Sequence, residues 1–122
     1  MKTIIRIEHS SGWGIFRAHD GDYNVIAKQF TFWEDLLEKH RDFPTPTCDS
    51  LIDRWIEDYE FCAFKSIEQI HNWFNKEWFS EMTTLGFKVL MLDVSEYVIG
   101  EYQVLYKKEN VLQSKDITNL FL

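Results

Sequence analysis

The chain has 122 residues and a mass of 14.7 kDa, with 45% hydrophobic and 27% charged residues. This composition excludes intrinsic disorder and lets a single domain, residues 1–122, bury a core without disulfides or metals. The 13 basic and 20 acidic residues give a net charge of −7. Because that charge repels phosphate backbones, we expect no direct binding to duplex nucleic acid.

The sequence carries none of the usual signals for membranes, metals or common cofactors. Apolar runs fall short of the roughly 20 residues that span a bilayer, and Arg6 and Glu8 interrupt the apolar start as no signal peptide does. We therefore expect a cytoplasmic protein without a membrane partner. Cys48 and Cys62 are far apart, which predicts free thiols, and no two histidines have metal-ligand spacing. Glycine-rich phosphate loops and hydrolase motifs are missing too.

The first third of the chain predicts a strand, a glycine-rich stretch and a helix. Residues 3–9 alternate branched apolar and polar side chains, as a strand with two different faces does. Trp13 lies between two glycines, so residues 10–22 are predicted as loop, short strand and loop. Apolar residues at helical spacing predict a helix over 32–40, which Thr31 can cap.

The middle of the chain predicts helices around one short strand. Two prolines, Pro44 and Pro46, predict a rigid loop. An amphipathic pattern predicts a helix over 51–59, and the apolar run 61–64 predicts a buried strand. Ser66 and Gln69 form a capping box that begins a further helix. A last helix is expected from residue 75 until Gly86 ends it.

The last third predicts mainly strands. Residues 87–94 are almost entirely apolar, which predicts a strand buried on both faces. A second strand is expected over 97–107, with a bulge or a close approach of another segment at Gly100. Residues 111–122 predict a short strand or a turn of helix. The sequence thus predicts an α+β fold, in which N- and C-terminal strands form a small mixed or antiparallel sheet and helices from the middle pack on it.

Four polar residues occupy places where an apolar strand does not need them: Arg6, Ser66, Glu101 and Gln103. An arginine can clamp phosphate, a serine can bond a sugar hydroxyl, and a carboxylate or amide can orient a ribose. The alternatives are an ion pair at a sheet edge for Arg6, a helix N-cap for Ser66 and a solvated strand position for Glu101.

Five segments together resemble a family of small phage and prophage proteins. They are 5–9, 14–17, 40–46, 62–69 and 100–108, which span most of the chain. The order of an arginine on the first strand, a serine after a middle strand and an acidic or amide residue on a late strand is in turn similar to the arginine–serine–glutamate class of ADP-ribosyltransferases.

This second resemblance implies NAD as cofactor and a host protein as target. It implies that Arg6 grips the NAD phosphate, that Ser66 is the middle-motif serine, and that Glu101 or Gln103 holds the nicotinamide ribose, with Trp13 lining the same cleft. The family motif ends in a glutamate two residues after Gln or Glu, whereas this chain has Glu101-Tyr102-Gln103.

A second hypothesis assigns the chain to a different functional class. A small acidic protein can bind a host defence or nucleic-acid-binding complex and inhibit it without catalysis, because a charge of −7 complements a basic channel. The exposed acids expected to take part are Glu34, Asp35, Asp53, Glu57 and Asp58. A structural or accessory domain is the third alternative.

Overall fold

Six strands form one sheet with the order β4-β5-β2-β1-β3-β6, which places the first strand of the chain near its centre. The computed structural model describes residues 1–15, 26–42, 60–100 and 103–122. All neighbouring strands in the sheet are antiparallel. The strands are β1 (Lys2–His9), β2 (Glu60–Phe64), β3 (Phe87–Val94), β4 (Val98–Ile99), β5 (Gln103–Lys107) and β6 (Val111–Asp116).

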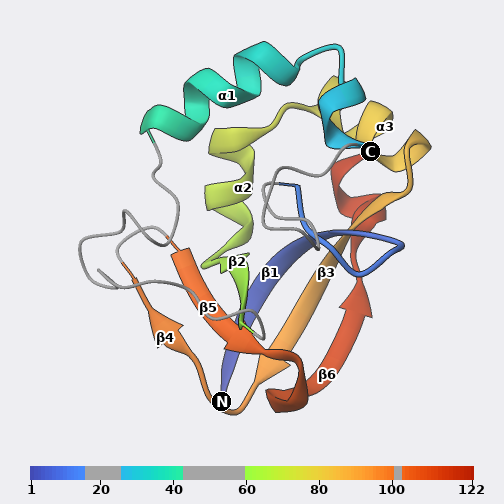
Figure 1. Cartoon of the computed structure of the whole chain (residues 1–122). Coiled ribbons are helices and arrows are strands. Elements are labelled where there is room, and N and C mark those ends of the chain that lie inside the picture. Colours follow the sequence, from blue (N-terminus) through green and yellow to red (C-terminus); the bar gives the residue numbers. More distant parts are fainter. Residues whose placement is uncertain (16–25, 43–59, 101–102) are drawn as a thin grey trace.

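Helices from the middle of the chain gather at the end of the sheet opposite the N-terminus (Figure 1). They are α1 (Trp33–Asp42), α2 (Ile67–Trp73) and α3 (Lys76–Thr84), with the 3-10 turns η1 (Ala27–Gln29), η3 (Lys108–Asn110) and η4 (Thr118–Phe121). The predicted α+β fold is therefore confirmed, and the middle strand β2 joins the terminal strands in the sheet. Among the described residues, no helix is long and apolar enough to cross a membrane.

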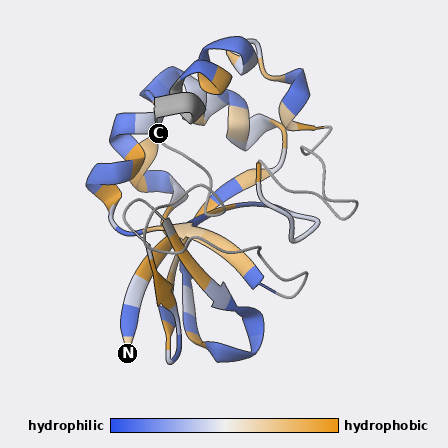
Figure 2. Ribbon diagram, turned by 60° about the vertical axis from the view of Figure 1, so that its left-hand side comes forward, coloured by the Kyte–Doolittle hydropathy of each residue, from blue (hydrophilic) through white to orange (hydrophobic). Residues whose placement is uncertain are grey.

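The two faces of the sheet bury different clusters of side chains. On β1, Ile5 and Ile7 point toward the helices and pack with Trp73 and Phe74 in the larger cluster. Ile4, which alternates with them, is fully buried in a second cluster that contains Val104 and Tyr106 and, among the described residues, no member from the helices. Figure 2 shows the hydrophobic colouring concentrated in the middle of the sheet. Alternation along β1 therefore gives each face its own core.

Predicted caps begin and end the helices. Ser66 Oγ accepts a hydrogen bond from Gln69 N at 3.2 Å, and Gln69 Oε1 accepts one from Lys65 N at 2.7 Å. Asn75 caps α3 in the same way, because its side chain accepts from the amide of Trp78 at 2.9 Å. Gly86 follows α3 with a φ of 94°, a conformation that favours glycine. The three helix boundaries read from the sequence are thus confirmed.

Three local predictions differ from the structure. The expected strand over 97–107 is two strands, since β4 turns back and pairs with β5 through Val98↔Leu105 and Ile99↔Val104. Gly100 therefore lies in the connection of a hairpin and not in a bulge. Thr31 does not cap α1; its amide and hydroxyl both donate to Glu81, at 2.8 and 2.6 Å. Residues 10–15 contain no strand, and the rest of the predicted loop, short strand and loop, residues 16–22, lies outside the described residues. The predicted helix over 51–59 lies outside them as well.

Candidate functional site

Arg6 is a buried cation on the sheet face away from the helices. It alternates with Ile5 and Ile7, and the residue is 6% exposed. Nη1 donates a hydrogen bond to the carbonyl of Cys62 at 2.7 Å. Nε lies 3.5 Å from Glu8 Oε1, an ion-pair contact that lacks hydrogen-bond geometry. Because burying a charge is costly unless it is partnered, these contacts explain how β1 tolerates an arginine.

Aromatic rings and a second cation complete the surroundings of Arg6. The ring of Phe61 lies 5.4 Å from Arg6 Cζ and 4.7 Å from Lys108 Nζ. Trp13 and Tyr106 have ring centroids 5.9 and 6.0 Å from that of Phe61. Cations are attracted to aromatic faces at such distances. We call these five residues the Arg6 cluster.

Two glycines let the loop after β1 approach the Arg6 cluster closely. A Cβ on Gly14 would lie 3.1 Å from Arg6 Nη1, and a Cβ on Gly12 would lie 3.1 Å from Lys108 Nζ. Gly12 also has a φ of 95°, and its carbonyl accepts from Lys108 Nζ at 3.5 Å. The amide of His9 donates to the carbonyl of Trp13 at 2.8 Å. The loop that carries Trp13 is thereby fastened over the guanidinium.

Burial in this cluster changes the ionisation of Tyr106. Desolvation raises the pKa of the Tyr106 phenol to about 12, although the Arg6 charge acts in the opposite direction. The phenol is therefore neutral at physiological pH, and the Arg6 guanidinium is the buried charge of the cluster. Cys62, whose carbonyl holds Arg6, is half-buried and forms no disulfide within the described part of the chain.

The structure brings together some of the predicted site residues and separates others. Arg6 and Trp13 both belong to the Arg6 cluster. Ser66 lies elsewhere, at the start of α2, and that helix packs through Ile70 on the opposite side of the sheet. The alternative role of Ser66 as an N-cap is observed. Arg6 makes an ionic contact, but on a central strand and not at a sheet edge.

The two late candidates, Glu101 and Gln103, give no side-chain geometry. Glu101 lies outside the described residues, as does Cys48. The backbone of Gln103 begins β5 and pairs with Phe64, while its side chain is outside the described part. Sequence reasoning missed Phe61 and Lys108, because nothing in the local pattern places either beside Arg6. Within the described residues, no three potential ligands are grouped as a metal site.

The fold and this site define a small α+β protein, built on one antiparallel sheet and holding an arginine–aromatic cluster. The chain belongs to the family described as bacteriophage T4 Y00F protein, whose family model matches residues 1–119. It is therefore a phage protein, as the resemblance of its segments implied. The match shows no likeness to ADP-ribosyltransferases. No curated protein and no solved structure matches the chain.

Proposed function

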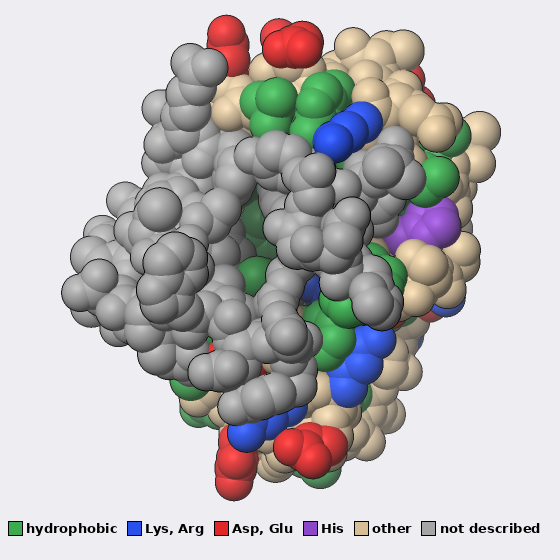
Figure 3. Space-filling model, viewed as in Figure 1, with side chains coloured by type: hydrophobic (Ala, Val, Ile, Leu, Met, Phe, Trp, Pro, Cys, Tyr) green, Lys and Arg blue, Asp and Glu red, His purple; other side chains and the backbone are tan. Residues whose placement is uncertain are grey.

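We propose that this phage protein acts by binding a host protein complex through its acidic surface, without catalysis. The carrying observation is the orientation of α1. Leu36 of this helix is fully buried, whereas Glu34, Asp35 and Glu38 are exposed. Acidic side chains appear at the end of the molecule where α1 lies (Figure 3). A negative surface of this kind speeds association with a basic partner such as a nucleic-acid channel.

The position of α1 is held from outside the helix. Thr31 lies just before α1, and its amide and hydroxyl both donate hydrogen bonds to Glu81 of α3. Charge-assisted hydrogen bonds of this type are stronger than neutral ones. The acidic face is thus presented on a fixed element, which reduces the entropy lost on binding.

Arg6 and Ser66 are already hydrogen-bonded within the protein, which favours a binding function over catalysis. Arg6 would have to contact the phosphate of NAD, but it is only 6% exposed and donates a hydrogen bond to the Cys62 carbonyl. The hydroxyl of Ser66 accepts from the backbone of α2. The two side chains therefore do not face one common substrate site.

A matched pair of triple variants tests the binding proposal. The partner is first captured from host lysate and purified, and its association rate with the wild-type protein is then measured at low and high salt. Neutralising Glu34→Gln, Asp35→Asn and Glu38→Gln should slow association roughly tenfold at low salt. The control, Glu77→Gln, Glu96→Gln and Glu109→Gln, removes the same charge from exposed sites elsewhere. Equal slowing by both sets would contradict a role for α1.

An NAD-binding, ADP-ribosyltransferase-like activity is the second candidate. It is favoured by one observation, namely that Arg6 and Trp13, both assigned to NAD, meet around Phe61. In such a transferase, Glu101 or Gln103 would face the nicotinamide ribose, where a carboxylate stabilises positive charge and an amide does so less.

Thermal unfolding with millimolar NAD tests this second candidate. Binding about tenfold tighter than the ligand concentration stabilises by roughly 1.4 kcal/mol and raises Tm by several degrees. The shift should occur in wild type and vanish in Arg6→Lys, which keeps the charge but lacks the planar donor fork. An unchanged Tm in wild type would reject NAD binding.

A further inference from the structure

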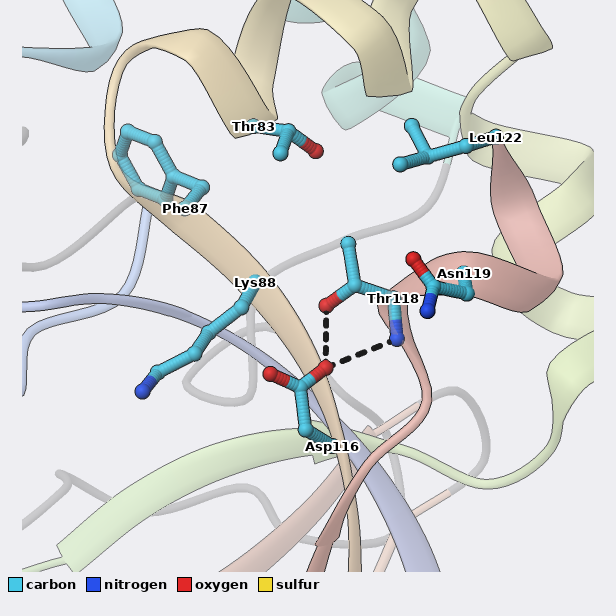
Figure 4. A pocket seen from close by; sticks show the side chains of 7 residues that line it. All are labelled: Thr83, Phe87, Lys88, Asp116, Thr118, Asn119 and Leu122. Atoms are coloured by element: carbon cyan, nitrogen blue, oxygen red, sulfur yellow. Dashed lines mark hydrogen bonds between the residues drawn. The ribbon is translucent and has the colours of Figure 1, made fainter.

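A hollow at the helix-covered end of the sheet has the size of a small-molecule site (Figure 1). It lies where α3, the start of β3 and η4 meet, and it has a volume of about 450 Å³. Ligand pockets commonly measure roughly 300–1,000 Å³. Its lining residues are Thr83, Phe87, Lys88, Asp116, Thr118, Asn119 and Leu122, all shown in Figure 4.

One carboxylate at the hollow is fixed in place. Asp116 Oδ1 accepts hydrogen bonds from the amide and the hydroxyl of Thr118, at 2.9 and 2.6 Å. That hydroxyl in turn accepts from the amide of Val89 at 2.9 Å. Thr118 lowers the pKa of Asp116, which keeps the carboxylate charged. Within the described residues, Asp116 Oδ2 has no hydrogen-bond donor, so it can bind a ligand.

A cation and an apolar wall complete the hollow. Lys88 is exposed and lines the hollow together with Asp116, whose pKa its positive charge also lowers. In Figure 4, Lys88 and Asp116 lie along the lower part of the site, whereas Thr83 and Leu122 lie across from them. Phe87 adds a buried aromatic surface. An acidic and a basic residue thus line the same hollow as a small apolar surface.

We propose that this hollow binds a small zwitterion of the α-amino-acid type with a short apolar side chain. The ammonium of the ligand meets Asp116 Oδ2 and its carboxylate meets Lys88 Nζ. The side chain of the ligand packs toward Phe87 and Leu122. A ligand with one charge leaves either Asp116 or Lys88 without a partner, so both charges are needed for binding. This inference does not depend on the function proposed above.

Titrations followed by amide NMR test this site. The probes are L-leucine and two analogues that each lack one charge, isoamylamine and 4-methylpentanoate. Leucine at millimolar concentration should move the signals of Lys88, Thr118 and Asn119. Each analogue should bind at least roughly tenfold more weakly, because one charge-assisted hydrogen bond is lost.

Two variants identify the contacts, and each should leave the fold intact. Asp116→Asn retains an acceptor for Thr118 but removes the charge, and Lys88→Gln removes the cation from an exposed position. Both should weaken leucine binding roughly tenfold, while Lys115→Gln on the exposed surface of β6 should not. The proposal is overturned if leucine moves none of these signals. It is equally overturned if isoamylamine binds as well as leucine, or if Lys88→Gln binds leucine like wild type.

Discussion

Truncating Arg6 to alanine should destabilise the protein strongly, because the side chain is a buried structural cation. The change removes the 2.7 Å hydrogen bond to Cys62 and the contact with Phe61, and it leaves Glu8 without its nearby positive charge. A hydrogen bond to a charged group contributes about 1.5–3 kcal/mol. Loss of a partly desolvated cation–π contact adds about 1 kcal/mol. We expect a loss of about 3 kcal/mol in the free energy of unfolding.

That loss converts to a measurable change in melting temperature. At about 2.1 cal/mol/K of unfolding entropy per residue, a chain of this length has about 0.26 kcal/mol/K in total. A loss of about 3 kcal/mol therefore lowers Tm by about 12 °C. Calorimetry or circular dichroism at neutral pH measures the shift, and urea unfolding gives the free energy independently.

A cation on the neighbouring strand provides the control. Lys88 lies on β3 and is exposed, so Lys88→Ala should change the stability by less than about 0.5 kcal/mol. Arg6→Lys keeps the charge but not the planar guanidinium, and should fall between wild type and Arg6→Ala. If Arg6→Ala melts as close to wild type as Lys88→Ala does, the buried structural role of Arg6 is wrong.

Three further outcomes follow from other contacts. Gly86→Ala should cost about 1–2 kcal/mol in urea unfolding, because its φ is 94° and a Cβ would lie 3.0 Å from His9 Nε2; wild-type stability would contradict that strain. Thr118→Val leaves the amide of Val89 without its acceptor and should cost about 2 kcal/mol; a neutral result would mean that the amide finds another partner. Since the Tyr106 pKa is raised to about 12 from 10.0, the unfolded chain loses this proton first, so stability is complete below pH 10 and falls as the pH rises toward 12. Tyr106→Phe should remove that alkaline loss in unfolding measured at stepped pH, and an unchanged pH profile would assign the loss to other groups.

Local signals in the sequence were sufficient for most elements. The alternation over 3–9 predicted β1, and the apolar run 87–94 predicted β3, because side-chain periodicity reports a buried strand face directly. Ser66, Asn75 and Gly86 marked helix boundaries since each satisfies or ends backbone hydrogen bonding within a few residues. Together these signals fixed the α+β class.

Features that depend on contacts between distant parts of the chain could not be predicted from local sequence patterns. The pattern over 97–107 is continuous, yet the chain turns back there and forms β4 and β5. The capping signal at Thr31 was overridden by Glu81, fifty positions away in the sequence. A hydrogen-bonding side chain takes the partner that tertiary contacts provide, so a local rule cannot anticipate it.

The same distinction between local and long-range information applies to the candidate site. The sequence by itself identified Arg6 as an unusual charge within an apolar strand, and Ser66 as a helix cap. Only the tertiary structure decided that Arg6 is covered by Phe61 and Gly14, and that Asp116 and Lys88 meet at one hollow. Periodicity indicates which face of a helix or strand is buried. The pairing of strands that are distant in the sequence determines which residues that face contacts, and both sites of this protein depend on such pairing.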